Sequence, residues 1–225
     1  KPNYLERAWE RIREEVSQGH QAYIVAPRIS ADPDAGADAD LDFLFGEESE
    51  EISSVEELAP MLHSGPLQGL KIAILHGRLA SEEKEATMQA FSRGEIDVLI
   101  STTVIEVGVD VPNATMMVIM DADRFGVSQL HQLRGRVGRG SAPGLCLLVS
   151  KAVPESPAME RLNAVASTLD GFELSRIDLE QRREGDVLGA SQSGVRSHLR
   201  LLRVLRDEEL IESAREIASK LIDED

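Results

Sequence analysis

Three arginines and three glycines are interleaved in one short segment in the second half of the chain. Residues 129–140 read Gln-Leu-His-Gln-Leu-Arg-Gly-Arg-Val-Gly-Arg-Gly. Arg136 and Arg139 are three residues apart, so on a helix they would share one face. A planar guanidinium can hold a phosphate through two parallel hydrogen bonds, and glycines leave bare backbone beside it for another molecule to approach. This spacing predicts two catalytic arginines that stabilise charge on a transferred phosphoryl group, an effect of about three to five orders of magnitude in rate.

Two other interpretations account for part of this segment. An exposed basic helix would explain the arginines, but glycines are poor helix formers and need a separate reason to be there. A dinucleotide-binding turn would explain glycines, but its Gly-x-Gly-x-x-Gly order is absent. The glycines here run Gly-x-x-Gly-x-Gly. Phosphate chemistry is therefore the interpretation that explains both residue types.

Short apolar strands and amphipathic helices alternate on either side of these arginines. We expect strands near 21–27, 71–75, 96–101, 115–121 and 145–150, and helices near 4–17, 81–92 and 128–137, with another that Ser53 or Ser54 can cap. Alternation of this kind predicts an α/β fold with a parallel sheet covered on both faces. Because ligands of such sheets bind at the carboxyl ends of the strands, we expect the functional residues there.

The pattern changes after residue 152. We expect helices near 157–169, 195–206 and 207–222 around an irregular stretch at 170–194 that is rich in Gly, Asp and Arg. The sequence therefore predicts two domains, 1–152 and 153–225. An acidic insertion at 31–51 within the first domain has the composition of a disordered or mobile loop.

The charge of the chain is strongly negative but unevenly distributed. A net charge of −16 argues by itself against binding to nucleic acid. However, residues 31–57 hold eleven acids and no Lys or Arg, and residues 207–225 hold eight acids and two bases. These segments contribute −11 and −6, which leaves +1 for the rest of the chain. Since DNA affinity depends on basic groups within about 8–10 Å, the composition does not exclude nucleic acid.

Membrane insertion and a disulfide framework are not expected. No run of 18 apolar residues occurs, and the first residues do not resemble a signal peptide. The single cysteine, Cys146, lies in an apolar run and is expected to be a buried core thiol. These features predict a protein of a reducing cytoplasm without a membrane partner.

The arginine segment closely resembles motif VI of superfamily 2 helicases, Gln-x-x-Gly-Arg-x-Gly-Arg. The matching residues are Gln132, Gly135, Arg136, Gly138 and Arg139. The resemblance implies that Gln132 binds nucleotide and that Arg136 and Arg139 reach across a cleft to ATP. It also implies a RecA-like three-layer fold that forms the second lobe of a two-lobed motor.

A second segment, after the strand near 96–101, resembles motif V of the same helicases. Hydroxyls and backbone amides at a strand end suit a sugar–phosphate backbone. From residue types alone, Asp110 could accept a hydrogen bond from a ribose hydroxyl or cap a turn. The resemblance implies DNA contacts for Thr102 and Thr103, nucleotide contacts for Gly108 and Asp110, and a role for Glu106 in coupling the two sites.

Two weaker similarities lie nearer the N-terminus. His76 and Arg78 flank a glycine directly after a strand, which fits an ordinary turn. These helicases have a strand-end His-Gly whose loop lies near the DNA backbone, so the resemblance implies DNA contacts for both residues. Residues 21–29 resemble motif IV, with Arg28 as a candidate nucleotide or domain contact.

The resemblance is closest to one helicase family. Residues 121–140 are similar to the RecG family of bacterial branched-DNA helicases, and a similar run occurs in the related Mfd translocases. Residues 171–194 resemble the TRG motif, which these two families share, although Arg183 and Glu184 depart from it. In that motif a helical hairpin and a loop convert domain motion into movement along duplex DNA. The resemblance implies a mostly helical TRG region over 153–225, with Arg182 and Gln192 in coupling roles.

The nucleotide-binding half of such a motor is missing from the sequence. There is no Gly-x-x-x-x-Gly-Lys-Ser/Thr phosphate loop and no Asp-Glu-x-His segment. The resemblance implies that ATP and Mg²⁺ are bound mainly by a first lobe outside this chain. We therefore expect the chain to be part of a longer protein and to hydrolyse no ATP alone.

The expected function is that of the second motor lobe of an ATP-dependent DNA helicase that acts on stalled forks and Holliday junctions in repair and recombination. Its expected partners are branched double-stranded DNA and the first lobe and wedge domain of the same protein, with the whole acting as a monomer. The alternatives are the matching lobe of a Mfd-type transcription-repair coupling translocase and a catalytically silent α/β interaction module. The motor hypothesis requires both arginines to face an interdomain gap and not to be locked into internal carboxylates.

Overall fold

The computed structural model describes residues 2–30, 53–102 and 110–181. The chain divides into two compact units, Lys1–Leu169 and Asp170–Asp225. The expected acidic insertion at 31–51 and the helices expected at 195–206 and 207–222 lie outside the described residues.

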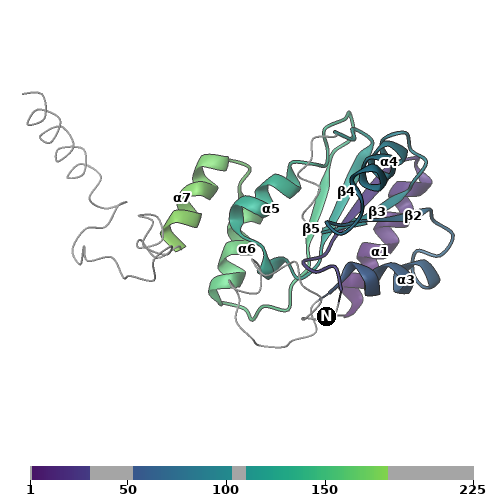
Figure 1. Ribbon diagram of the computed structural model, residues 1–225. Coiled ribbons are helices and arrows are strands. Elements are labelled where there is room, and N and C mark those ends of the chain that lie inside the picture. The colour runs from purple at the N-terminus through teal and green to yellow at the C-terminus, as the bar shows by residue number, and fades with distance from the viewer. Residues whose placement is uncertain (1, 31–52, 103–109, 182–225) are drawn as a thin grey trace, which may run out of the picture. The chain divides into compact units, whose positions relative to one another are not determined.

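A five-stranded parallel sheet forms the centre of the first unit. Its strands are β1 (Gln21–Val25), β2 (Ile72–Leu75), β3 (Val98–Ser101), β4 (Ala114–Ile119) and β5 (Leu145–Leu148). They are arranged in the order β2-β3-β1-β4-β5, and all four pairings are parallel (Figure 1). The three inner strands β1, β3 and β4 are buried along their whole length. The predicted α/β fold with a covered parallel sheet is confirmed.

One face of the sheet is covered by α1 (Pro2–Ser17) and α3 (Val55–Ser64). Trp9 and Ile12 of α1 and Leu62 of α3 lie in one apolar cluster with Ile24 and its neighbours on β3 and β4. The first helix ends at Ser17 as expected, and Gly19 just beyond it takes a φ of +86°. The helix α3 begins after Ser54, but the Ser54 hydroxyl donates to Glu57 Oε2 at 2.9 Å and does not accept a backbone N–H.

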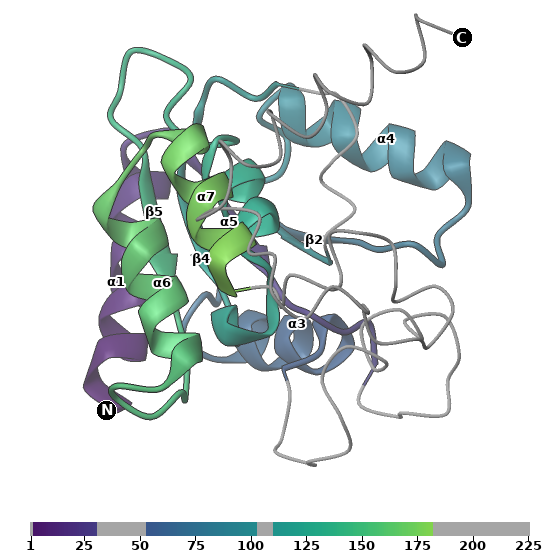
Figure 2. The ribbon, with the colours of Figure 1, turned by 90° about the vertical axis from the view of Figure 1, so that its left-hand side faces the viewer.

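The opposite face carries α4 (Ser81–Ser92), α5 (Val127–Arg134) and α6 (Pro157–Ser167). The Tyr23 ring of β1 packs against Phe91 of α4, with ring centroids 4.9 Å apart. The short helix η2 (Ala122–Arg124) connects β4 to α5. Figure 2 shows α6 running alongside β5, and Arg161 of α6 donates to the Asp123 carbonyl at 3.1 Å. Helix α5 packs against α6, and α6 packs against η2.

Helix α5 is shorter than expected and ends at Arg134 instead of residue 137. The Gly135 N–H closes the last turn on the His131 carbonyl at 3.0 Å, and Gly138 takes a φ of +73°, which does not continue a helix. Arg136 and Arg139 therefore lie in a turn after the helix. The expectation that they share a helical face is wrong, although they remain close in sequence.

The stretch expected to be irregular at 170–194 begins with a helix, α7 (Gly171–Gln181). Asp170 caps it by accepting the Phe172 N–H at 2.8 Å, and Glu173 lies in its first turn. The expectation of an irregular stretch is therefore wrong for its first part, because Asp170 can cap a helix there. The first unit also extends to Leu169 and so includes α6, which the sequence analysis assigned to the second domain.

Candidate nucleotide and DNA-contact sites

The arginine-bearing turn lies beside the amino ends of two strands. The Gly138 N–H donates to the carbonyl of Ala114, the first residue of β4, at 3.2 Å. Gly144, which directly precedes β5, lies against Gly138. Helix α5 starts near the carboxyl end of β4 and runs back over the sheet, so its last turn lies near the amino ends of the strands. The expectation that all functional residues lie at the carboxyl ends is therefore wrong for Arg136 and Arg139.

Two of the glycines are required by the chain's own packing. A Cβ on Gly138 would lie 2.6 Å from the Gly144 nitrogen, and one on Gly140 would lie 2.5 Å from the Pro112 carbonyl oxygen. Both distances are shorter than side-chain contacts allow, so these positions admit only glycine without movement of the backbone. The glycines were expected to admit another molecule. At positions 138 and 140 they admit neighbouring backbone of the same lobe.

Arg139 and Asp110 form an ion pair, which joins the two motifs that the sequence analysis assigned to nucleotide. Arg139 Nη1 contacts Asp110 Oδ1, and Arg139 Nε donates to the Gly135 carbonyl at 2.5 Å. Both side chains are exposed, at 40% and 57% respectively. The requirement that the arginines avoid internal carboxylates is thus not met by Arg139. Since an exposed pair contributes only about 0–1 kcal/mol, a phosphate can compete with Asp110 for the guanidinium.

Tyr23 lies within electrostatic reach of the same charges. Burial raises the pKa of Tyr23 to about 12, while Arg136 and Arg139 act to lower this pKa and Asp110 acts to raise it. The charges of Arg136, Arg139 and Asp110 therefore all act on one side chain of the central strand β1. Sequence reasoning treated Tyr23 only as part of a buried strand, and nothing in its local pattern marked it as a neighbour of these groups.

The remaining nucleotide candidates differ in position. Gln132 is exposed on the last turn of α5, one turn before Arg136. Arg136 itself is half-buried. In the described ranges no three His, Cys, Asp or Glu side chains gather into a possible metal site.

The DNA-contact candidates Thr102 and His76 lie at the carboxyl ends of neighbouring strands, as expected. Residue Leu75 pairs with Ser101 at the ends of β2 and β3, and the Thr102 N–H donates to the Leu75 carbonyl at 3.3 Å. Thr102 is 5% exposed and His76 is half-buried. Among the described residues the buried His76 Nδ1 has no hydrogen-bond partner.

Arg78 lies in the exposed turn that follows His76. Its guanidinium is 3.4 Å from the Ser30 hydroxyl and 4.0 Å from the Glu56 carboxylate, and Lys84 Nζ donates to the Gly77 carbonyl at 3.1 Å. Basic groups therefore gather beside the ends of β2 and β3. The structure brings His76, Arg78 and Thr102 to the carboxyl ends of β2 and β3. It places the arginine turn at the amino ends of β4 and β5.

The remaining candidates, Thr103, Glu106, Gly108, Arg182 and Gln192, lie outside the described residues. Of the described residues on either side of 103–109, Thr102 follows the carboxyl end of β3 and Asp110 pairs with Arg139 of the arginine turn.

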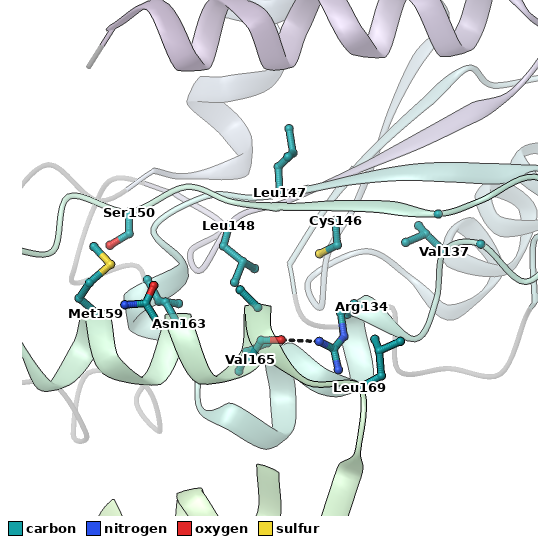
Figure 3. Close-up of a pocket in the computed structure, with 14 residues that line it drawn as sticks. Arg134, Val137, Cys146, Leu147, Leu148, Ser150, Met159, Asn163, Val165 and Leu169 are labelled. Carbon is teal, nitrogen blue, oxygen red and sulfur yellow. Dashed lines mark hydrogen bonds between the residues drawn. The ribbon is translucent and has the colours of Figure 1, made fainter. Parts of the chain in front are cut away.

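A cavity of about 620 Å³ lies between β5 and α6 (Figure 3). Arg134, Cys146, Leu148 and Met159 line it with other residues of the first unit. Burial raises the pKa of the Cys146 thiol to about 12, so the thiol is protonated at neutral pH and is a poor nucleophile. Cys146 is half-buried and lines a cavity, where a fully buried core position was expected.

Comparison with known proteins identifies the chain. The model of the helicase conserved C-terminal domain matches residues 6–141, and that of domain 3, C-terminal, of the ATP-dependent DNA helicase RecG matches residues 168–225. The chain belongs to the RecG helicases. No helix in the described residues is long and apolar enough to cross a membrane.

Individual RecG proteins are similar over nearly the whole chain. The ATP-dependent DNA helicase RecG of Mycobacterium leprae (strain TN) is 54% identical over 98% of this chain and 29% of its own length. RecG of Staphylococcus epidermidis (strain ATCC 35984) is 44% identical over 92% of this chain and 28% of its own length. The structure of RecG bound to a three-way DNA junction matches with a TM-score of 0.66 and 38% identity, over 93% of this chain and 24% of that one. The chain thus spans less than a third of these RecG relatives.

Proposed function

We propose that this chain is the second motor lobe of an ATP-dependent translocase that remodels branched double-stranded DNA, such as stalled forks and Holliday junctions, in bacterial repair and recombination. The observation that carries the proposal is the turn that presents an exposed Arg139 three residues after Arg136, where the pair with Asp110 is open to solvent and a phosphate can replace the carboxylate. The names of the RecG relatives support it. The match of residues 168–225 to RecG favours this function over that of a Mfd-type translocase.

The arginine turn has the chemistry to bind a polyphosphate. The guanidinium of Arg139 presents donors at the surface, and Arg136 lies three residues earlier on the same turn. In this proposal ATP and its Mg²⁺ are held mainly by a first lobe that the chain does not contain. When the first lobe closes onto this one, Arg139 exchanges its contact with the Asp110 carboxylate for one with a phosphate oxygen. Asp110 then becomes able to accept a hydrogen bond from a ribose hydroxyl.

The side chains at the carboxyl ends of β2 and β3 have the chemistry to contact a DNA backbone. Arg78 offers an exposed guanidinium and His76 a half-buried imidazole at neighbouring strand ends, and Thr102, 5% exposed, lies beside them. Contacts of this type fix position on a duplex without reading its sequence, which is what a translocase needs. The segment from Thr102 to Asp110 then links phosphate binding to movement along DNA. We infer that the protein acts in the cytoplasm as a monomer, with its first lobe and wedge domain in the same chain.

The test is DNA-stimulated ATP hydrolysis by the full-length protein carrying Arg139→Ala. We expect kcat to fall about 1,000-fold or more, because the group that stabilises transition-state charge is removed. Circular dichroism and the melting temperature should remain unchanged, since the exposed Arg139–Asp110 pair contributes little to stability.

Arg93→Ala is the matched control. Arg93 is 57% exposed and pairs with Glu95 at 2.7 Å, so it resembles Arg139 in setting but lies after α4. Its kcat should equal that of the unchanged protein. Intact ATPase in the Arg139→Ala protein would favour the interaction-module alternative and reject the motor proposal.

A further inference from the structure

Arg134 is the third arginine of the glycine-rich segment, and neither the nucleotide site nor the DNA site uses it. Its guanidinium points to α6 (Figure 3). Nη1 donates to the carbonyls of Val165 and Thr168, the latter at 2.7 Å, and Nη2 lies 3.0 Å from His131 Nδ1. Because a guanidinium only donates, His131 must accept through Nδ1 and carry its proton on Nε2.

These contacts join the ends of two helices. Arg134 is the last residue of α5, while Val165 and Thr168 flank the end of α6 at Ser167. The last carbonyls of a helix have no partner within it and carry its negative dipole end, so a fork of N–H donors with positive charge suits them. In the described residues no carboxylate lies within ion-pairing distance of Arg134. The guanidinium therefore serves backbone carbonyls, and its fork geometry matters as well as its charge.

The catalytic candidates lie directly after this junction. The turn is held at its start by Arg134 on α6 and at its end by the Gly138 N–H on the Ala114 carbonyl. Arg136 lies between these two anchors, and Arg139 directly follows the second. If the first anchor were lost, the end of α5 could shift against the sheet and move both guanidinium groups. A misplacement of about 1 Å can reduce catalysis roughly 100-fold.

We propose that Arg134 is a positioning residue for the motor reaction. It fixes the turn that presents Arg136 and Arg139, through α6, and does not itself contact phosphate. This inference rests on the proposed function, since it assigns a role within that same reaction. It goes beyond it by giving a task to an arginine outside the motif VI pattern and to the carbonyl end of α6.

The experiment measures kcat, KM for ATP and the melting temperature of the full-length protein with saturating branched DNA. Arg134→Lys keeps the charge but loses the fork. We expect its kcat to fall about 10-fold, less than the loss for Arg139→Ala, with KM within about twofold. Arg134→Gln is measured beside it, because its amide can still donate to one carbonyl; its loss in kcat should have the same sign.

Arg13→Lys is the matched control. Arg13 Nη1 likewise donates to two backbone carbonyls, those of Pro66 and Gln68 at 3.2 and 3.0 Å, but on the opposite face of the sheet. This variant should lower the melting temperature by an amount similar to Arg134→Lys and leave kcat unchanged. An equal loss of kcat in both variants would mean that Arg134 acts only through general stability, and would overturn the inference.

A double-mutant cycle separates positioning from an independent effect. In the Arg139→Ala background, the fold-decrease in kcat caused by Arg134→Lys should be less than half of the fold-decrease that it causes in the unchanged protein, because one of the two groups that Arg134 positions is absent. If the fold-decreases of the two substitutions simply multiply, the positioning role of Arg134 is rejected while the proposed function stands. The same conclusion follows if Arg134→Lys leaves kcat unchanged while Arg139→Ala is inactive. An active Arg139→Ala protein would reject the proposed function instead.

Discussion

At the scale of single residues, the glycine-rich turn has two kinds of position. Gly138 combines a φ of +73° with a close approach to Gly144, so both its backbone angle and its missing side chain are needed. Gly135 takes an ordinary helical φ of −66°, and a Cβ there would meet the Gln132 carbonyl oxygen at 3.4 Å. The same residue type therefore has a structural task at position 138 and leaves room for a ligand only at position 135.

The structure predicts that replacing these two glycines by alanine has very different effects on stability. Gly138→Ala should reduce the free energy of unfolding by about 2–4 kcal/mol, from the left-handed backbone and the clash with Gly144 together. Gly135→Ala should change it by less than about 1 kcal/mol. Urea denaturation of this chain, followed by circular dichroism, measures both. Equal stability of the two variants would show that the close approach of Gly138 to Gly144 is relaxed at little cost.

At the scale of elements, one buried carboxylate fastens α1 to the amino end of the sheet. Glu15 is 7% exposed and accepts hydrogen bonds from Thr115 Oγ1 at 2.6 Å, Arg11 at 2.6 Å and His20 Nδ1 at 3.0 Å. The hydrogen bond from Thr115 is the main cause of the lowered pKa of Glu15. Burial acts to raise this pKa, but Thr115, His20 and Arg11 together outweigh it. Helix α1, β4 and the turn before β1 thus share one charged junction.

This junction predicts a dependence of stability on pH. Because the pKa of Glu15 is lower in the folded chain than in the unfolded one, its contribution is complete above the unfolded pKa of about 4.5 and is lost as the pH falls through the folded value. Glu15→Gln should therefore reduce the free energy of unfolding by about 1.5–3 kcal/mol at pH 7, and the deficit should shrink below about pH 4.5.

Glu14→Gln is the comparison variant for this measurement. Glu14 is 59% exposed and contacts only Arg11 among these partners, so its replacement should cost less than about 0.5 kcal/mol at any pH. Urea denaturation at pH 7, 5 and 3.5 gives the differences. A deficit for Glu15→Gln that stays constant across this range would contradict the assignment of the charge.

At the scale of the whole molecule, the candidate nucleotide and DNA contacts lie at opposite ends of the strands of one sheet. The arginine turn lies by the amino ends of β4 and β5, and the DNA-contact candidates lie by the carboxyl ends of β2 and β3. Neither edge of the described lobe contains a phosphate loop, and the sequence has none. The reaction that we propose therefore requires a first lobe in addition to this one.

The isolated chain of 225 residues should consequently release no phosphate from ATP above the rate of buffer alone, with or without branched DNA. A coupled phosphate assay measures this, with the full-length protein at the same concentration as the positive control. Turnover that increases with DNA in the isolated chain would reject the division of labour between two lobes.

The sequence by itself determined the fold class, most of the elements and the family. Alternating apolar strands and amphipathic helices predict a parallel sheet because each element must bury one face. Apart from α5, the described elements whose two ends were predicted lie within about two residues of those ends, whereas η2 and α7 were not predicted. The order of arginines and glycines was sufficient to indicate motif VI, since few other tasks require both residue types at that spacing.

Only the tertiary structure decided which groups meet. Asp110 and Arg139 are 29 residues apart in sequence, and their pairing depends on the return of α5 across the sheet. Tyr23 and the end of α6 approach the same turn from distant parts of the chain. Local pattern reports which face of an element is buried, whereas the partner of a charged side chain depends on how elements pack. For this reason the role of Gly138, the anchor at Arg134 and the Asp110–Arg139 pair could not be predicted from the sequence.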